Sequence, residues 1–212
     1  MLTVIATAQR GGQGGFRRGF AAGGPGILMR PDVVKELKLT DSQATKIESL
    51  LESMRPQGRG GFGGGGGGGG GGRGGGGGGR GGFGRGGDPE QAAETDKKLK
   101  EILNDAQYKR FHELSLQQAG GFALNQPRVA EQLELTSSQK SKLEDLRTDM
   151  DEERRDMFSG GGGGGDREAM RAETRLMRTE YGKKMLKVLN ADQKKKWAEM
   201  VGKPFKFAND DR

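Results

Sequence analysis

The sequence predicts an all-α protein built of two tandem helical hairpins, packed as one pseudo-symmetric helical unit, with a disordered Gly-rich N-terminus and disordered Gly-rich loops. Three observations lead to this fold class. Glycine accounts for 42 of the 212 residues, and 38 of these glycines lie within residues 1–30, 57–87 and 160–165. Outside these tracts the chain is rich in Leu, Lys, Glu, Gln and Met, which favour helices. The other two observations are an internal repeat and a recurring helix-start motif.

The internal repeat divides the chain into two halves. Residues 31–54 and 127–150 are identical at eleven of 24 aligned positions, at an offset of 96. Residues 100–114 match residues 186–200 at an offset of 86, with Phe111 aligned to Trp197. Each half therefore contains the same two segments in the same order, which indicates a duplication.

A motif of Leu, then Thr or Asn, then Gln three residues later predicts four helix starts. Thr or Asn is a favourable N-cap because its side-chain oxygen accepts a hydrogen bond from a first-turn N–H. Gln three residues later can accept a hydrogen bond from the N-cap N–H, which completes a capping box. The four boxes consist of Leu39, Thr40 and Gln43; Leu103, Asn104 and Gln107; Leu135, Thr136 and Gln139; and Leu189, Asn190 and Gln193.

The spacing of apolar residues predicts a pair of helical arms in each half. The arms within a half match in length, as antiparallel partners must, and the sequence Asp88-Pro89-Glu90 is typical of a helix start. The Gly tracts 57–87 and 160–165 fall between the arms, so we expect them to be the hairpin tips. The predicted arms cover 41–57 with 88–103 in the first half, and 137–159 with 166–189 in the second.

The N-terminus resembles the end of a signal peptide. Leu2 to Ala8 is apolar, and Ala6-Thr7-Ala8 has the small-x-small pattern of a cleavage site, although the usual basic leader is missing. We therefore expect a periplasmic or otherwise exported protein in which the start of the signal peptide is missing. The expected organisation is residues 1–8 as a signal-peptide remnant, 9–27 as a disordered Gly/Arg-rich tail, 28–119 as the first helical repeat and 120–212 as the second.

The net charge of +7 belongs to the Gly-rich tracts. Residues 1–30 and 57–87 contain eight Arg and no acidic residue, so the rest of the chain has a net charge of −1. Arg-Gly-Gly units with Phe, as in residues 59–87, are typical of RNA-binding segments. Four Arg would give a single-strand salt slope of only about −2.8, which is a weak contribution. We do not expect nucleic acid to be the partner, but an RNA-binding module is kept as an alternative function.

Several kinds of chemistry are excluded by composition. The chain has no Cys and a single His, His112, which the polar helix around it predicts to be a surface residue. No spacing of nucleophile and base or of carboxylates suggests catalysis, so we expect neither an enzyme nor a metal or other cofactor. No apolar run approaches the roughly 18 residues of a membrane span.

The remaining candidate residues are apolar positions at helical spacing. Packing is the default interpretation of such a stripe. A surface that receives adaptable clients is the main alternative, because Met side chains are flexible, and soft-metal binding is a third. The candidate packing or client-binding residues are Ile47, Leu51, Met54, Phe111, Met150, Met157, Met170, Met177 and Trp197.

The four boxes resemble those of the LTxxQ-motif family of Spy/CpxP-like periplasmic refolding chaperones. The resemblance covers residues 28–207 apart from the Gly tips. It implies an exported, all-helical, ATP-independent chaperone that binds unfolded or partner proteins, and family members form antiparallel dimers, which suggests a homo-oligomer. Asn replaces Thr at Asn104 and Asn190, which preserves capping, and the repeat is doubled here. The family's client-binding cradle is basic, whereas the helical part of this chain is not. A structural scaffold without a client is a further alternative.

The repeat also predicts how the halves pack. A lone two-helix hairpin leaves its apolar stripe exposed to water, so we expect the two hairpins to cover each other. Phe111 and Trp197 should then lie in matching environments, and replacing either by Ala should cost on the order of 3 kcal/mol.

Overall fold

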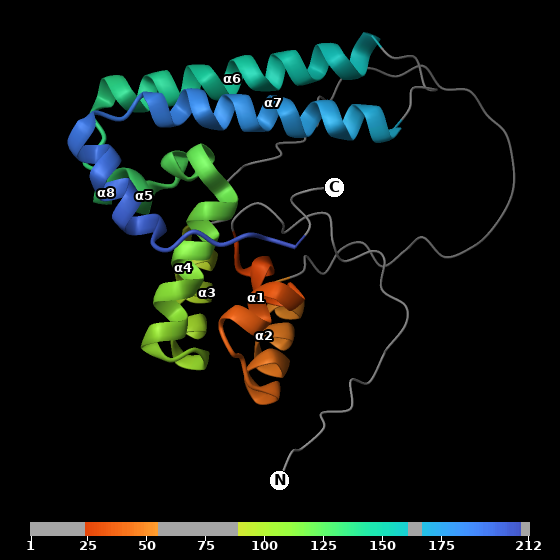
Figure 1. The fold of residues 1–212 in the computed structure, drawn as a ribbon, viewed down its shortest axis with the longest axis vertical. Helices are drawn as coiled ribbons and strands as arrows, with labels where there is room; N and C mark the ends of the chain where they lie inside the picture. Colours follow the sequence, from red (N-terminus) through yellow and green to blue (C-terminus); the bar gives the residue numbers. More distant parts are fainter. Residues whose placement is uncertain (1–23, 55–88, 161–166, 209–212) are drawn as a thin grey trace, which may run out of the picture.

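The computed structural model describes residues 24–54, 89–160 and 167–208, and these residues form helices and connecting segments without a β-strand (Figure 1). The prediction of an all-α protein is therefore confirmed. The elements, with η denoting a 3-10 helix, are η1 (Pro25–Met29), α1 (Pro31–Glu36), α2 (Asp41–Ser53), α3 (Pro89–Ile102), α4 (Asp105–Ala119), η2 (Gly120–Asn125), α5 (Pro127–Gln132), α6 (Ser137–Gly160), α7 (Arg167–Lys187) and α8 (Ala191–Val201).

The Gly-rich segments fall almost entirely outside the described residues, and two boundaries differ from the prediction. The structured part begins before residue 28, because Pro25–Met29 forms η1 and Ile27 is only 1% exposed. Gly160, which we expected in the second hairpin tip, is the last residue of α6. The rest of both tips and residues 9–23 of the expected tail lie outside the described residues.

Each half contains a pair of adjacent helices. In the first half α2 packs against α3, and in the second α6 packs against α7. The members of each pair are similar in length, with 13 and 14 residues in the first half and 24 and 21 in the second. Figure 1 shows α6 and α7 side by side along most of their length. Among the described helices, none combines the length and the apolar character needed to cross a membrane.

The hairpins do not cover each other as the sequence led us to expect. The described residues form two separate hydrophobic clusters, and a short 3-10 helix covers each hairpin. η1 packs against α2 and supplies Ile27 and Leu28 to the first cluster, while η2 packs against α6 and α7 and supplies Ala123 and Leu124 to the second. The buried part of the apolar stripe of each hairpin is thus covered by the chain segment that precedes it.

The two halves are joined because each sends a segment into the other. α4 belongs to the first half, but its continuation η2 packs in the second cluster. The segment after α8 returns to the first half, where Phe207 is buried in the first cluster. The helices α4 and α8 also pack against each other. At the end of each helix a glycine, Gly120 or Gly202, turns the chain with a φ of 56° or 60°.

Phe111 and Trp197 do not share an environment. Phe111 is 3% exposed and belongs to the first cluster, whereas Trp197 is only half-buried against the second. The expectation of matching environments was wrong, because the aromatic residues that complete the first cluster include Phe205 and Phe207 of the C-terminal segment. The aligned helices α4 and α8 therefore meet different neighbours.

Lys38 and Glu134, which follow α1 and α5, occupy equivalent left-handed positions. Their φ angles are 50° and 52°. The Leu39 N–H donates to the Val34 carbonyl at 3.1 Å, and the Leu135 N–H donates to the Ala130 carbonyl at 2.9 Å. This pattern ends a helix with a left-handed residue, a position that glycine occupies most easily.

We predict that Lys38→Gly raises the free energy of unfolding by about 1 kcal/mol, because it relieves the left-handed strain of a residue with a Cβ. The Lys38 side chain is exposed, so little packing is lost. Lys35→Gly, at an exposed position inside α1, is the matched control and should lower stability by about 1 kcal/mol. Urea unfolding followed by circular dichroism measures both, and equal effects of the two substitutions would contradict the prediction.

Candidate functional site

All four predicted boxes have capping-box geometry. The Thr40 hydroxyl accepts from the Gln43 N–H at 3.2 Å, and the Gln43 side chain accepts from the Thr40 N–H at 3.1 Å. Equivalent pairs of hydrogen bonds form at Asn104, Thr136 and Asn190. The boxes thus begin α4, α6 and α8 in the same way as they begin α2.

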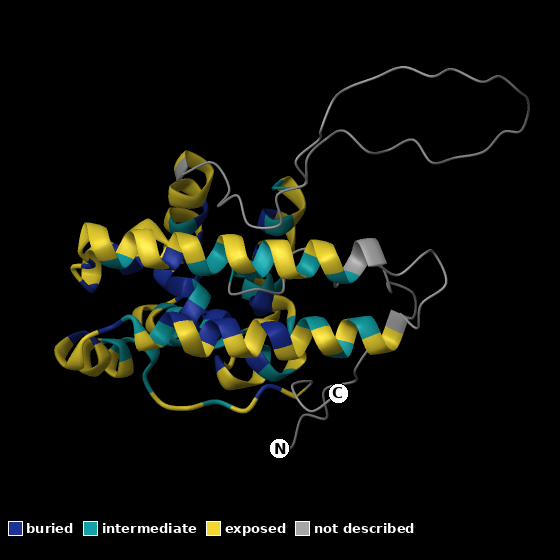
Figure 2. Cartoon of the chain, turned by 90° about the horizontal axis from the view of Figure 1, so that it is seen from above, coloured by how far each residue is buried: buried dark blue, intermediate teal, exposed yellow. Residues whose placement is uncertain are grey.

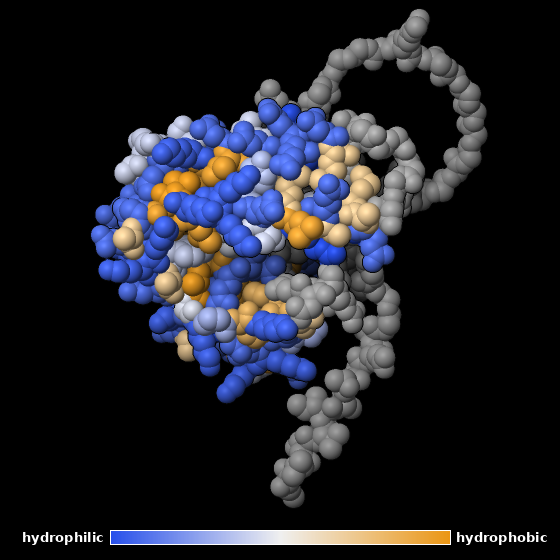
Figure 3. All heavy atoms as spheres, turned by 45° about the horizontal axis from the view of Figure 1, so that its top comes forward, coloured by the Kyte–Doolittle hydropathy of each residue, from blue (hydrophilic) through white to orange (hydrophobic). Residues whose placement is uncertain are grey.

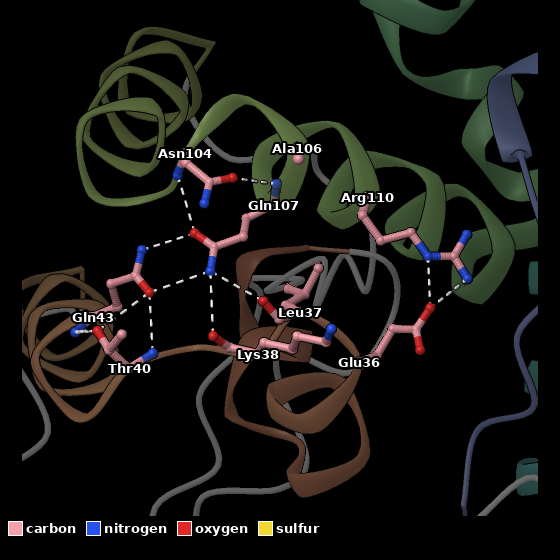
Figure 4. Close-up of a pocket in the computed structure, with 9 residues that line it drawn as sticks. All are labelled: Glu36, Leu37, Lys38, Thr40, Gln43, Asn104, Ala106, Gln107 and Arg110. Carbon is pink, nitrogen blue, oxygen red and sulfur yellow. Dashed lines mark hydrogen bonds and ion pairs between the residues drawn. The ribbon is translucent and has the colours of Figure 1, made fainter.

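The Gln residues of the two boxes in one half bind each other. In the first half Gln43 Nε2 donates to Gln107 Oε1 at 2.8 Å, and Gln107 Nε2 lies 3.3 Å from Gln43 Oε1 (Figure 4). Gln43 Nε2 also donates to the Ile102 carbonyl at 2.9 Å, and Gln107 Nε2 donates to the Leu37 carbonyl at 3.0 Å. The amide pair therefore connects the start of α2 to the start of α4 and binds the ends of α1 and α3.

The second half repeats this arrangement. Gln139 Nε2 donates to Gln193 Oε1 at 2.7 Å and to the Val188 carbonyl at 3.0 Å. Gln193 Nε2 donates to the Leu133 carbonyl at 3.1 Å and to Gln139 Oε1 at 3.0 Å. Gln193 is 7% exposed, so this amide pair is largely removed from water.

The paired amides explain why each box contains Gln rather than Glu. A capping box needs only an acceptor at this position, which Glu provides equally well. A carboxylate has no N–H, so it could not donate to the carbonyls at the helix ends or to the other Gln. Local sequence analysis identified the cap and missed the pair, because the two Gln residues are 64 positions apart in the first half and 54 in the second. The sequence signal for this pairing was the presence of Gln, rather than Glu, at all four boxes.

We predict that Gln193→Glu lowers the free energy of unfolding by about 2 kcal/mol or more at neutral pH. The carboxylate keeps the cap acceptor for the Asn190 N–H but leaves the Leu133 carbonyl without this donor and removes one of the two donors to Gln139 Oε1, in a largely buried place. Gln132→Glu, at an exposed position at the end of α5, is the control and should change stability by less than about 0.5 kcal/mol. Chemical unfolding of both variants provides the comparison. A Gln193→Glu variant as stable as the control would show that the pair contributes nothing.

A surface pocket beside the first amide pair is closed by an ion-pair network. Its wall includes Glu36 and Arg110, which lie opposite the Gln pair (Figure 4). The Arg110 guanidinium donates to Glu36 at 2.9 Å, to Glu113 at 2.8 Å and to the Lys203 carbonyl at 2.8 Å. Burial disfavours its charge, but Glu113 and Glu36 outweigh burial and raise the pKa of Arg110. These contacts hold Arg110 between two carboxylates and the segment that follows α8.

Asp96 on α3 joins three helices and both halves. Its carboxylate accepts from the Tyr108 hydroxyl at 2.7 Å and from Arg128 of α5 at 3.2 Å, and it lies 3.2 Å from His112 Nε2. The His112 ring also packs edge-on against Tyr108, with ring centroids 4.4 Å apart. His112 is therefore half-buried in an interhelical cluster, and the prediction of a surface residue was wrong. Burial, together with the charge of Arg128, outweighs Asp96 and lowers the pKa of His112 below 6.5.

This lowered pKa predicts a loss of stability in mild acid. The unfolded chain binds a proton at His112 near pH 6.5, whereas the folded chain binds it only at lower pH. The contribution of neutral His112 is therefore complete above pH 6.5 and is lost as the pH falls through and below that value. Urea unfolding at pH 5 and pH 7.5 should show lower stability at pH 5. His112→Gln should reduce this difference, since the chain contains no other His; an unchanged difference would contradict the assignment.

The apolar candidate residues divide into a buried and a half-buried set. Ile47 is fully buried and Met177 is 6% exposed, so both belong to the hairpin cores. Leu51 and Met54 pack half-buried against the first cluster, as Trp197 does against the second. The other candidates, Met150, Met157 and Met170, are half-buried.

These three Met residues lie in the distal part of the α6/α7 hairpin, defined as residues 147–157 and 168–176. None of the residues in the distal part is buried, and Figure 2 shows the buried positions of both long helices away from their tip. Leu176 is 68% exposed, although it is apolar. The space-filling view in Figure 3 shows further apolar patches within a mainly hydrophilic surface.

Over their whole lengths, the two long helices also differ in charge. Basic residues outnumber acidic ones seven to three on α7, whereas acidic residues outnumber basic ones seven to five on α6. Within α7 the Thr174 hydroxyl donates to the Met170 carbonyl at 2.7 Å, and between the helices it lies 4.0 Å from the Met157 sulfur. The seam between the two helices thus contains flexible, apolar Met side chains, and charges of both signs flank it.

Comparisons with protein-family models, with curated proteins and with solved structures give no match for this chain. Within the described ranges, no group of three His, Asp or Glu side chains is placed to hold a metal ion. The function is therefore argued from the boxes and from the surface of the α6/α7 hairpin.

Proposed function

We propose that the chain is an exported, ATP-independent chaperone-like or envelope-stress protein that binds unfolded or partner proteins through its helical hairpins. The observation that carries this proposal is the distal part of the α6/α7 hairpin, where none of the other described elements buries the half-buried Met150, Met157 and Met170 or the exposed Leu176. A helix pair gains stability by burying such residues, and we take their partial exposure along one stretch of the hairpin as the candidate interaction site.

The chemistry of the distal hairpin suits loosely specified clients. Met has an unbranched, flexible side chain that adapts to varied apolar partners. Along the whole hairpin, α6 has an excess of acidic residues and α7 an excess of basic ones, which offer complementary charges to segments of either sign. Neither feature requires a nucleotide or a metal, which supports an activity without ATP.

The proposal extends to the organisation of the chain. The matching amide pairs, Gln43 with Gln107 and Gln139 with Gln193, support two tandem copies of one hairpin unit arranged pseudo-symmetrically. The resemblance of the boxes to those of the LTxxQ family supports export of the protein, and it supports unfolded or partner proteins as the clients. A homo-oligomer would then present several copies of this client surface.

The test is suppression of aggregation of an unfolded model client by the purified full chain, without ATP and at several-fold molar excess. The fourfold variant Met150→Gln, Met157→Gln, Met170→Gln and Leu176→Gln should lose most of the protection. The control variant carries Thr148→Gln and Ala169→Gln, at exposed positions of the same two helices. Circular dichroism must show equal helix content. No protection by the wild type rejects the proposal, as does equal protection by the fourfold variant.

Deletion of residues 58–87 separates this proposal from RNA binding by the Arg-Gly-Gly tract. Protection of the client should persist after the deletion, since the distal part of the α6/α7 hairpin remains. RNA binding by the full chain that disappears in the deletion variant, together with no protection by either protein, would favour the RNA-binding alternative.

A further inference from the structure

The C-terminal segment, residues 203–208, is bound by the first half as a peptide would be. It follows α8 without helical structure, and in Figure 1 it crosses α4. The residues that contact it come from α4 and from the start of α1, which are remote in sequence from the segment. We call the surface between α4 and the start of α1 the tail groove.

Side chains of the tail groove bind the backbone of the segment. Gln117 Nε2 donates to the Lys203 carbonyl at 2.9 Å, and Gln117 Oε1 accepts from the Phe205 N–H at 2.8 Å. Arg110 donates to the same Lys203 carbonyl at 2.8 Å. Farther along, Asp32 accepts from the Ala208 N–H at 2.7 Å. These contacts recognise an extended backbone without regard to its side chains, as peptide-binding grooves do.

Selectivity comes from two phenylalanines separated by one residue. Phe207 is 3% exposed, and Phe205 packs half-buried against the same cluster. Their rings are perpendicular, with centroids 4.9 Å apart, and the Arg30 guanidinium lies 4.7 Å from the centroid of the Phe207 ring. The side chains of Lys203, Pro204 and Lys206 are exposed.

Gly202 joins α8 to the segment in a conformation that requires glycine. Its φ is 60°, and a Cβ at this position would lie 2.4 Å from Glu113 Cδ. Departure of the segment from the groove would break the hydrogen bonds that Arg110, Gln117 and Asp32 make with the backbone of residues 203–208. The apolar residues that Phe207 covers would then be exposed.

We infer that the tail groove is a peptide-binding site for extended segments with the pattern aromatic-x-aromatic, and that residues 203–208 occupy it as an intramolecular ligand. The corresponding partner is an unfolded polypeptide that exposes two aromatic side chains on one side of its backbone. The contacts described above support the groove and its occupation by residues 203–208. Its use by clients rests on the proposed chaperone function, which it deepens by naming the segment that is bound.

A free peptide must compete with the attached segment for the tail groove. A tethered ligand acts at an effective concentration on the order of millimolar, so a free peptide binds weakly while the segment is in place. Displacing the segment should therefore strengthen the binding of a free peptide by a large factor.

The first experiment measures fluorescence anisotropy of a labelled peptide with the sequence of residues 203–208. Its partners are the wild-type full chain and the full-length variant Phe205→Ser with Phe207→Ser. The variant should bind the peptide at least ten-fold more tightly than the wild type, and a peptide with both Phe replaced by Ala should bind neither. Equal affinity of the two proteins, or equal binding of the two peptides, overturns the proposal.

A second experiment avoids dependence on that variant. The chain has no Cys, so Asp32→Cys with Ala208→Cys introduces a single pair that can lock the segment in place. The oxidised protein should not bind the peptide, whereas the reduced protein, in which the segment is tethered but not locked, should bind it weakly even without the Asp32 acceptor. Equal binding in the two states overturns the proposal.

The same locked protein separates this inference from the proposed function. Peptide binding after reduction without protection of any client rejects the chaperone function and retains the groove. Protection of a client that is equal in the oxidised and reduced states, while peptide binding differs, places client binding elsewhere and overturns the use of the groove by clients.

Discussion

Gly121→Ala should lower the free energy of unfolding by more than about 3 kcal/mol, because the backbones of η2 and α7 touch at this position. A Cβ on Gly121 would lie 2.1 Å from the Gly182 carbonyl oxygen and 3.0 Å from Gly182 Cα. Both groups are backbone atoms of a long helix, so neither can move aside without shifting α7 or η2. The measurement is urea unfolding of the purified variant, followed by helix circular dichroism.

Gly182→Ala is the matched control for this contact. A Cβ on Gly182 would meet the Phe122 ring at 3.7 Å and the Gly121 nitrogen at 3.8 Å, which are ordinary contact distances. Since Ala favours a helix over Gly by up to about 1 kcal/mol, this variant should be neutral or more stable than the wild type. Similar stability of the two variants would mean that η2 does not approach α7 as closely as the structure indicates.

Phe111→Ala should cost about 3 to 5 kcal/mol, whereas Trp197→Ala should cost about half as much or less. Phe111 is 3% exposed in the first cluster, so its removal leaves a cavity bordered by side chains from several elements. Trp197 is half-buried at the edge of the second cluster, where water can replace part of the lost ring. Thermal and urea unfolding of both variants give the two values.

This difference tests the two-cluster architecture. If the two hairpins instead covered each other in one pseudo-symmetric core, the aligned aromatics would be equally buried and the two variants equally destabilised. Phe111→Leu, which keeps most of the apolar volume, is the control and should cost about 1.5 kcal/mol or less. Equal losses for Phe111→Ala and Trp197→Ala would contradict the structure.

The sequence by itself determined the helices and their starts. The four Leu-(Thr/Asn)-x-x-Gln boxes are local signals, because a cap and its Gln are three residues apart and bind the same turn. Equal arm lengths within each half also follow from the sequence, since the Gly tracts mark where a helix must stop. For these reasons α2, α4, α6 and α8 begin where the boxes predict, within one residue.

Only the tertiary structure decided how these helices bury their apolar faces. The pairing of Gln43 with Gln107, the cover that η1 and η2 provide, and the return of Phe207 to the first cluster join residues far apart in the chain. Periodicity identifies an apolar face but not the segment that covers it. The sequence therefore led to the prediction that the two hairpins cover each other. The short 3-10 helices fill the clusters instead, because each brings two apolar side chains close to a hairpin without a long loop. Among the described residues, η2 covers the α6/α7 hairpin at its base, where Gly121 lies against Gly182, and the distal part has no buried residue.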